Sequence, residues 1–288
     1  MNNIALAKKY SSLLDEVYRS SSVTAVLESD SSLARDGANA NEIVIPRLDM
    51  DGLADYSRSE GYVSGDVSLV WETAAYNYER GRMFSVDSLD NEESVNVAFG
   101  RLAGEFLRTK VAPEIDAFRF SVYASTDGIG KAAGKITSGE AAVAAVRAAV
   151  SQMNEAEVPS DGRILFITPT LKGLIEDMDT TKSRAVFADF DAVISVPQSR
   201  FYTGVELLDG LSDNEKSGGY RKAADASDIN FMIVHRDAVL QFTKNIVPKI
   251  ISPAQNPDAD AWKYGYRSYG LCSVFANKVK GIYVHSAS

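Results

Sequence analysis

The stretch from Ser94 to Tyr123 constrains the fold of this chain most, because its apolar residues recur every three or four positions throughout. These positions are Val95, Phe99, Leu102, Phe106, Leu107, Val111, Ile115, Phe118 and Val122. The opposite face carries charged side chains, namely Arg101, Glu105, Arg108 and Lys110. The pattern predicts an amphipathic helix of roughly 45 Å, longer than most globular helices, which other elements must cover.

Pro113 falls inside this helical pattern. Proline has no amide hydrogen, and its ring clashes with the carbonyl one turn earlier. We therefore expect the helix to kink or break near Val111–Ala112.

The composition is that of a soluble folded protein, with 45% hydrophobic and 24% charged residues among 288. The net charge of −9 argues against a nucleic-acid-binding surface spread over the molecule. No apolar run reaches the roughly 18 residues of a membrane span, and MNNIALAKKY lacks the apolar core of a signal peptide. The single cysteine, Cys272, excludes an intrachain disulfide and a cysteine-built zinc site, so we expect a reducing cytoplasm.

Residues 1–40 combine a short amphipathic segment with a polar, serine-rich run. The residues on the apolar face of that segment are Leu6, Tyr10, Leu13, Leu14, Val17 and Tyr18. Such a leader lacks the apolar content to fold alone, so it is either disordered or ordered by a partner. We favour ordering by a neighbouring subunit, because the apolar face needs a surface to cover it.

From Glu42 the hydrophobic period changes to two, and the chain is rich in Val, Tyr, Trp and Phe as far as Val86. Residues 51–61, DGLADYSRSEG, form a polar tip in this pattern. The pattern predicts a long β-hairpin or short meander from about Ile43 to Val86. Because an isolated hairpin is marginally stable in water, we expect it to pack on another copy of the chain.

Residues 126–237 predict a compact α/β unit with mixed strands. Ser138 begins a helix that ends by Pro159–Gly162, and residues 163–169 form a short buried strand followed by a second helix. Further strands are expected at 190–196, 199–207 and 229–235, and the tail from 238 returns to β structure. The whole pattern predicts an α+β fold.

One glycine-rich stretch matches a cofactor motif. Gly128-Ile129-Gly130-Lys131-Ala132-Ala133 fits GxGxxA, which in a dinucleotide-binding turn lets the backbone approach a pyrophosphate. That turn needs a preceding strand, whereas a long helix precedes it here, and Gly134-Lys135 is followed by Ile136 instead of the Ser or Thr of a P-loop. We interpret this stretch as a flexible inter-domain loop and expect no cofactor.

Two histidines offer little for catalysis. His235-Arg236-Asp237 spells the kinase catalytic-loop triplet, but the glycine-rich loop, strand lysine and DFG do not occur in the expected order. We interpret it as a strand end turning into a loop. His285 lies near the C-terminus, and the chain has no G-x-S-x-G elbow for a hydrolase triad.

Asp49, Asp51 and Asp55 crowd the expected hairpin tip. Solvated carboxylates are the simplest interpretation; a weak calcium contact is the alternative, although the spacing is not that of an EF-hand. We therefore predict no catalytic, cofactor-binding or metal-binding residues. The aromatic residues also alternate on strands, which favours packing over base stacking: Trp71, Tyr76, Tyr78 and Phe84.

In the order of its elements the chain resembles the major capsid proteins of tailed bacteriophages, whose coat fold encapsulin shells share. The resemblance covers essentially the whole length. Its most specific local match is Val111-Ala112-Pro113-Glu114-Ile115-Asp116-Ala117-Phe118-Arg119-Phe120, which looks like the proline-interrupted end of the spine helix in these proteins. The ending from Trp262 to Val284, with Asn277-Lys278-Val279-Lys280-Gly281-Ile282-Tyr283, looks like their final peripheral-domain strand.

The resemblance implies an N-terminal arm at 1–40, an extended E-loop at 41–90, a peripheral domain at 91–125 and 238–288, and an axial domain at 126–237. Such subunits would form pentamers and hexamers of an icosahedral shell around double-stranded DNA, assembled in the bacterial host cytoplasm and found in the virion. The partners implied are a scaffolding protein, a portal and decoration or head-completion proteins, with no membrane. An acidic subunit suits a container that does not grip its DNA tightly.

Two differences from relatives narrow this expectation. Some relatives join subunits by an isopeptide bond from an E-loop lysine, but this chain has no lysine between Lys9 and Lys110, so we expect no such cross-link. Some also carry a cleaved N-terminal scaffolding region. Here the hairpin begins by about Ile43, which leaves little room for one, so we predict a separate scaffolding protein.

Two alternatives remain open. An encapsulin-like shell that holds cargo protein would have the same fold, and neighbouring terminase and portal genes would distinguish a phage shell from it. A small-molecule-binding α/β enzyme is the remote alternative, weakened because we find no nucleophile–base or metal constellation in the sequence.

Overall fold

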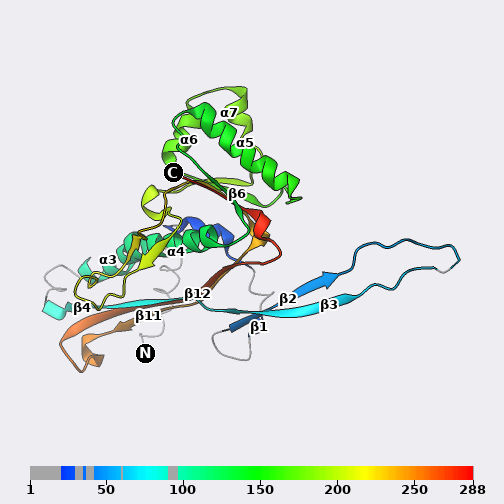
Figure 1. Cartoon of the computed structure of the whole chain (residues 1–288). Coiled ribbons are helices and arrows are strands. Elements are labelled where there is room, and N and C mark those ends of the chain that lie inside the picture. The colour runs from blue at the N-terminus through cyan, green and yellow to red at the C-terminus, as the bar shows by residue number, and fades with distance from the viewer. Residues whose placement is uncertain (1–20, 30–34, 37–41, 60, 90–96, 288) are drawn as a thin grey trace.

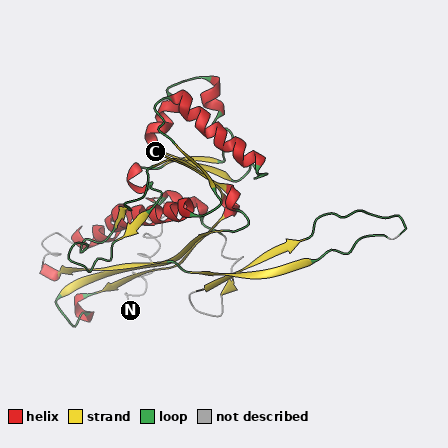
Figure 2. Cartoon of the chain, viewed as in Figure 1, coloured by secondary structure: helices red, strands yellow, loops and turns green. Residues whose placement is uncertain are grey.

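The computed structural model describes residues 21–29, 35–36, 42–59, 61–89 and 97–287. Its body is built of stacked layers, and one long β-hairpin projects from it (Figure 1). Across the body the layers are three helices, a five-stranded sheet, a long central helix and a three-stranded sheet (Figure 2). The predicted α+β class is confirmed.

The central helix, called the spine helix below, forms from the stretch with the strongest helical period. It consists of α3 (Val97–Phe106), a π-helical turn η3 (Leu107–Val111) and α4 (Ala112–Ser125). In the π turn the Ala112 amide donates to the carbonyl of Leu107, and Pro113, which has no amide to donate, follows directly. The predicted irregularity near Val111–Ala112 is confirmed and takes the form of this turn. Ser94, the expected start, lies outside the described residues.

The two halves of the central helix are buried differently. Glu105 and Arg108, before α4, form an exposed ion pair at 2.7 Å, as expected for an outward charged face. In α4 the charged residues Glu114, Asp116 and Arg119 are buried together with the apolar ones. This difference arises because α4 lies between the two sheets, so that ten of its fourteen residues are buried (Figure 1).

The three-stranded sheet supports one side of this helix. It has the order β11-β12-β4, with β11 (Val239–Ile251), β12 (Ala261–Val274) and β4 (Tyr78–Asp87) all antiparallel. Its aromatic side chains pack against the spine in one apolar cluster: Tyr78, Tyr264 and Tyr266 with Leu107, Val111 and Ile115. The spine and this sheet therefore share a core.

The hairpin is shorter than predicted. It pairs β2 (Glu42–Met50) with β3 (Val67–Ala75), and a two-residue strand β1 (Arg35–Asp36) adds to β2. The expected extension to Val86 is wrong, because β4 leaves the hairpin and pairs with β12 instead. Asn77 lies where the chain passes from β3 to β4: its side-chain amide donates to the carbonyl of Cys272 and accepts from the amide of the same residue.

The five-stranded sheet has the order β5-β13-β10-β6-β7. Its strands are β5 (Gly130–Ala133), β6 (Arg163–Ile167), β7 (Ala192–Ser195), β10 (Ile229–His235) and β13 (Ile282–Ser286). The helices α5 (Gly139–Glu155), α6 (Pro169–Glu176) and α7 (Thr181–Ala185) cover one face. As predicted, Ser138 caps α5, accepting the Ala141 amide at 3.2 Å.

Alternation along β6 shows how this sheet divides two cores. Ile164 and Phe166 face the spine helix, whereas Leu165 and Ile167 face the α5 and α6 layer. All four side chains are fully buried, which is why residues 164–167 form a continuous apolar run in the sequence.

Two segments of this sheet correct the sequence interpretation. The stretch assigned to a flexible loop contains β5, which pairs in parallel with β13 at the sheet edge. The C-terminal strand β13, expected in the peripheral part, lies instead between β5 and β10 of the α/β unit. Strand propensity identified β13, but only the long-range pairing placed it.

Short elements complete the described chain: 3₁₀ helices η1 (Val23–Leu27), η4 (Gln198–Arg200), η5 (Arg236–Ala238), η6 (Pro253–Gln255) and η7 (Val279–Gly281), and the ribbon of β8 (Val205–Leu207) with β9 (Tyr220–Lys222). Within the described ranges, no helix has the length and apolar character needed to cross a membrane.

Candidate assembly surfaces and the arm-docking site

The hairpin carries a continuous apolar face. Its register places three cross-strand pairs on one side of the ribbon: Pro46 with Trp71, Leu48 with Leu69, and Met50 with Val67. The apolar side chains of Leu48, Met50, Val67, Leu69 and Trp71 are between 43% and 70% exposed. This is an exposed apolar stripe of the kind that marks an interaction surface.

This apolar face does not continue the molecule's own core. At the hairpin root, Ile43 and Ile45 pack with Ala74 against the end of the β11–β12 pair. Side chains alternate along a strand, so Ile43 and Ile45 point to the side opposite Pro46 and Leu48. The hairpin therefore uses one face for its own body at the root and leaves the other exposed.

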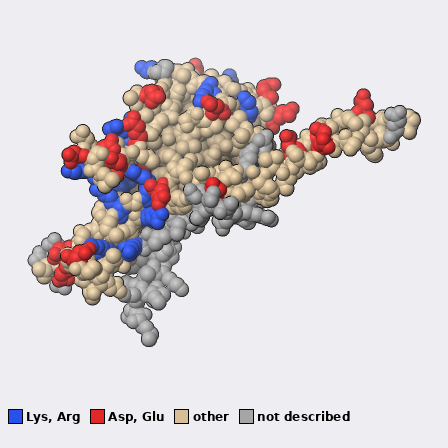
Figure 3. Space-filling model, turned by 60° about the horizontal axis from the view of Figure 1, so that its bottom comes forward, with Lys and Arg blue, Asp and Glu red and all other residues tan. Residues whose placement is uncertain are grey.

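The aspartates predicted for the hairpin tip are exposed, and two apolar or aromatic residues of the tip, Leu53 and Tyr56, are exposed as well. Asp51 accepts a hydrogen bond from the Asp66 amide at 2.8 Å. Figure 3 shows Asp and Glu along the visible face of the hairpin, and Lys and Arg, with Asp and Glu among them, toward the end of the body away from the hairpin. The described residues contain no group of three or more His, Cys, Asp or Glu able to hold a metal ion.

The N-terminal arm docks on its own spine helix. Asp116 of α4 is fully buried, and its carboxylate accepts four hydrogen bonds from the arm: Ser22 Oγ at 2.7 Å, the Val23 and Thr24 amides at 3.1 Å, and Thr24 Oγ1 at 2.7 Å. The carboxylate thus caps the first turn of η1, where Ser22 makes no side-chain cap of its own. A fifth bond comes from Arg200 Nη1 at 2.9 Å.

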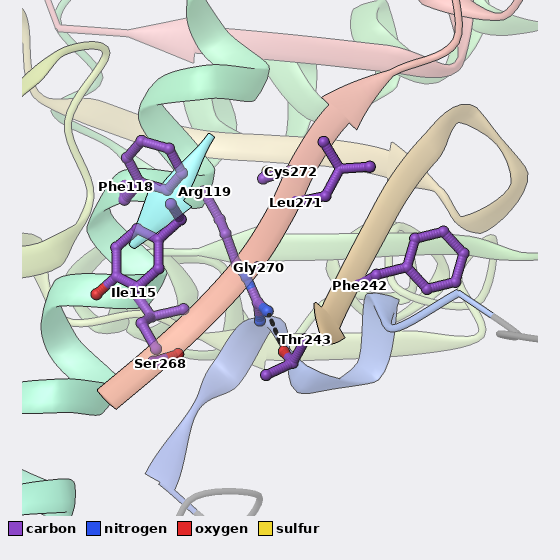
Figure 4. Close-up of a pocket in the computed structure, with 10 residues that line it drawn as sticks. Ile115, Phe118, Arg119, Phe242, Thr243, Ser268, Gly270, Leu271 and Cys272 are labelled. Atoms are coloured by element: carbon purple, nitrogen blue, oxygen red, sulfur yellow. Dashed lines mark hydrogen bonds between the residues drawn. The ribbon is translucent and has the colours of Figure 1, made fainter. Parts of the chain in front are cut away.

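Arg119, one turn further along α4, secures the end of the same segment. It is buried and donates to Thr24 Oγ1 at 3.1 Å, to Glu28 Oε1 at 2.8 Å and to Thr243 Oγ1 of β11 at 3.2 Å. Figure 4 shows this guanidinium reaching from α4 toward Thr243 beside a cavity of about 10 Å³. That space is the size of one water and cannot hold a small-molecule ligand.

Gln241 of β11 completes the docking site. Its side chain accepts from Tyr123 Oη at 2.7 Å and donates to the Thr24 carbonyl at 2.8 Å, while its own carbonyl accepts the Ser29 amide at 2.9 Å. Burial raises the pKa of Tyr123 well above its ordinary value, so its hydroxyl stays a donor. For residues 21–29, ordering by a neighbouring subunit is wrong; the chain's own helix and strand order them. Residues 1–20, with the apolar face, lie outside the described residues.

A second buried carboxylate, that of Glu114, joins the other side of α4 to the region of the β8–β9 ribbon. Glu114 Oε1 accepts from Arg80 Nε at 2.8 Å and from Tyr78 Oη at 3.2 Å. Arg80 Nη2 donates onward to the carbonyls of Leu208 at 2.7 Å and Gly219 at 3.2 Å. Burial and the nearby Glu114 charge raise the pKa of Tyr78. Arg80 therefore connects β4, the spine and the β8–β9 region.

The docking residues Asp116, Arg119 and Gln241 were not predicted from the sequence. Asp116 and Arg119 lie among the apolar positions Ile115 and Phe118 of a helix, and this is the one signal that could have indicated them. Buried charges are costly unless paired, so charged residues within the most apolar part of a helix predict partners. The identity of these partners could not be predicted, because Arg200 and Gln241 are far along the chain.

The GxGxxA match has a packing explanation. Gly128 has φ of +81°, and a Cβ at Gly130 would lie 2.5 Å from the ring of Tyr283 on the adjacent strand. The first glycine permits the turn out of α4, and the second lets Tyr283 cover β5. The context needed for pyrophosphate binding, a strand before the glycines and a helix after them, is replaced here by a helix before them and a strand made from them.

The two histidines have structural positions. His235 Nδ1 accepts the Asp237 amide at 3.2 Å and so caps η5, which fits the predicted strand end. His285 stacks on Phe231, and its Nδ1 lies 3.0 Å from the side-chain amide nitrogen of Asn230. Burial lowers the pKa of His285. Burial also raises the pKa of the Cys272 thiol to about 12, which makes it a poor nucleophile.

The comparisons with known proteins give a consistent result for the fold. No protein-family model and no curated protein matches the sequence. Solved structures do match: one titled Gordonia phage Cozz (TM-score 0.61, 12% identity, 93% of this chain and 86% of that chain) and the capsid structure of cyanophage P-SCSP1u (TM-score 0.56, 11% identity, 88% and 85%). The virus-like particle from Pyrococcus furiosus matches as well (TM-score 0.59, 13% identity, 96% and 98%).

These matches cover most of this chain and most of each matched chain, so they concern the complete arrangement of hairpin, spine and two sheets. Their low sequence identity limits the conclusion to the architecture. The resemblance drawn from the order of elements is thereby confirmed at the level of the fold: this chain has the α+β coat fold found in tailed-phage capsids and in a related virus-like particle.

Proposed function

We propose that this chain is the major capsid protein of a tailed bacteriophage, which assembles as pentamers and hexamers into an icosahedral shell around double-stranded DNA. The fold supports this proposal, but the observation that carries it is the hairpin. Two cross-strand apolar pairs, Leu48 with Leu69 and Met50 with Val67, project from the body, and their side chains are more than half exposed in the described chain. An exposed hairpin of this kind is stable only when a partner covers it.

The partner proposed for this face is another copy of the chain. A hairpin at one end that packs on the body of the next subunit makes a head-to-tail contact, and such contacts close into rings when the rotation allows it. Acidic side chains lie along the hairpin, and Lys and Arg, with acidic side chains among them, lie toward the other end of the body (Figure 3). Attraction between the hairpin carboxylates and these basic side chains would favour such a contact.

We assign the parts as follows: an arm at 1–40, an E-loop at 41–90, a peripheral domain at 91–125 and 238–288, and an axial domain at 126–237. Two strands cross these boundaries, since β4 belongs to the peripheral sheet and β13 to the axial sheet. The subunit is proposed to act structurally and not as an enzyme, in the virion, after assembly in the host cytoplasm.

The proposed partners beyond the shell are a separate scaffolding protein, a portal, decoration or head-completion proteins, and packaged DNA held without sequence-specific contacts. A net charge of −9 supports weak contact with DNA. A shell that encloses cargo protein is the second candidate, favoured by the match to a virus-like particle over nearly the full length of both chains.

Electron microscopy of the full chain, expressed alone and with its neighbouring reading frames, tests the proposal. Closed shells of uniform size, or rings that close only with a scaffolding partner, are the expected result. Nuclease-protected DNA in shells made with terminase and portal would support the phage role, whereas co-purified protein cargo would support the second candidate. A monomer under every condition would overturn both.

A further inference from the structure

Asp116 connects two segments that are far from each other in the sequence. The arm contributes four hydrogen bonds to its carboxylate, and Arg200 of the axial segment contributes the fifth. We propose that Asp116 couples docking of the arm segment 21–29 to the position of the axial segment 198–207, so that release of either loosens the other. This coupling belongs to the folded subunit and does not depend on the shell it builds.

The coupling follows from what each release would leave behind. With the arm undocked, a fully buried carboxylate would lose four of its five hydrogen bonds and keep only Arg200. With Arg200 displaced, the same buried charge would keep only neutral donors from the arm. Leaving a buried charge with unmade hydrogen bonds is costly, so each segment lowers the free energy of the arrangement that the other needs.

Arg200 is placed to transmit this effect. The same Nη1 that donates to Asp116 also donates to the Ser21 carbonyl at 3.2 Å, so one nitrogen touches both the spine and the arm. The next residue, Phe201, is fully buried against Phe120 of α4, with ring centroids 4.7 Å apart. Tyr220 Oη donates to the Ser199 carbonyl at 2.8 Å, which links this turn to strand β9.

The Arg80–Glu114 junction provides an internal comparison. It too pairs a buried carboxylate of α4 with a partly exposed arginine that reaches the β8–β9 region. Among the described residues, Arg80 and Glu114 make no hydrogen bond or ion pair with residues 21–29, whereas Arg200 and Asp116 both contact that segment directly. Disturbing the two junctions should therefore have different effects on the arm.

Hydrogen–deuterium exchange of the full-length protein, read by mass spectrometry, tests the coupling. Thr24→Val keeps the side-chain shape but removes the hydroxyl that donates to Asp116 and accepts from Arg119. We expect amide exchange to rise in residues 22–29 and, by about fivefold or more, in residues 198–207 as well. Arg200→Met should produce the reciprocal rise in residues 22–29. Arg80→Met, the matched control, should raise exchange near residues 208–219 and leave residues 22–29 at the wild-type rate.

Two results would overturn the proposal. One is faster exchange in 22–29 for Thr24→Val with 198–207 unchanged; the other is equal loosening of the arm by Arg80→Met and Arg200→Met. If Thr24→Val does not fold, Ser22→Ala, which removes a single donor to Asp116, provides the same comparison with a smaller rise. Shell formation is scored separately by microscopy, so failure of the coupling and failure of the proposed function are distinguishable.

Discussion

The hairpin and the arm segment 21–29 would both be marginally stable in isolation, and they differ in what stabilises them. The hairpin forms a regular antiparallel ladder but exposes its apolar side chains, so what it lacks is a partner for its surface. The arm segment 21–29 has little regular structure, yet Asp116, Arg119 and Gln241 meet its polar groups within the same chain. Of the two, only the hairpin exposes large apolar side chains, among them Leu48, Met50 and Leu69.

The two regions also differ in the interaction available to each: apolar burial for the hairpin and charge-assisted hydrogen bonds for the arm. Apolar burial is not directional and tolerates approximate fits, which suits the proposed packing of the hairpin against neighbouring subunits in slightly different positions. Buried charge-assisted hydrogen bonds require particular partners at particular distances, which suits a contact made once within the subunit. The following predictions test this division, from the largest expected effect to the smallest.

Phe106→Asp should have the largest effect on subunit stability. Phe106 packs edge-on against Phe84 and Tyr266, with ring centroids 4.8 and 5.8 Å away. An aspartate would lose this packing and place an unpaired charge beside an apolar cluster, which we expect to cost about 5 kcal/mol, comparable to the whole stability of a domain. Loss of soluble protein is the expected readout; a normal urea midpoint would contradict the shared core of spine and sheet.

Asp116→Ala should destabilise the folded subunit by about 3 kcal/mol, because it leaves Arg200 and the arm donors without their acceptor in a buried site. Asp116→Asn keeps one acceptor oxygen and should cost less. Urea unfolding of both variants measures the difference. Equal unfolding free energies for wild type and Asp116→Ala would show that the arm docks without this carboxylate.

Leu69→Ser should block assembly while the subunit stays folded, since Leu69 is 55% exposed on the apolar face of the hairpin. Val70→Ser is the matched control: Val70 is 51% exposed but points to the opposite face. Trp71→Ala, on the apolar face, should behave like Leu69→Ser, and each variant should change subunit stability by less than about 1 kcal/mol. Equal loss of shells with Leu69→Ser and Val70→Ser, scored by microscopy, would refute a one-sided interface.

The pH dependence should be the smallest effect. Burial lowers the pKa of His285, so the unfolded chain binds this proton at a higher pH than the folded one. Stability should therefore be complete above the ordinary histidine value of about 6.5 and fall as the pH drops through it. His285→Asn should flatten this part of the curve in thermal unfolding measured between pH 7.5 and 5. An unchanged slope would place the acid sensitivity elsewhere.

The spacing of apolar residues alone predicts much of this architecture. The helical period from Ser94 identified the spine, and Pro113 located its irregularity to within a turn. Ser138, the strand at 163–167 and the strand at 229–235 were each found from local signals. Local signals succeed there because capping, burial and side-chain alternation act between residues that are close along the chain.

The features that the sequence did not predict depend on contacts between segments far apart in the chain. β4 pairs with β12 instead of continuing the hairpin, and β13 is placed by pairing with residues far upstream. Docking of the arm depends on Asp116, Arg200 and Gln241, contributed by three separate segments.

Local patterns in the sequence predict which residues are buried, where the spine helix is irregular, and that the hairpin is marginally stable in isolation. The pairing of the strands, the packing role of Gly130 and the docking of residues 21–29 on their own subunit are visible in the three-dimensional structure alone. The spacing of apolar residues indicates which side chains are buried. The partners of those side chains are set by contacts that form only when distant segments meet.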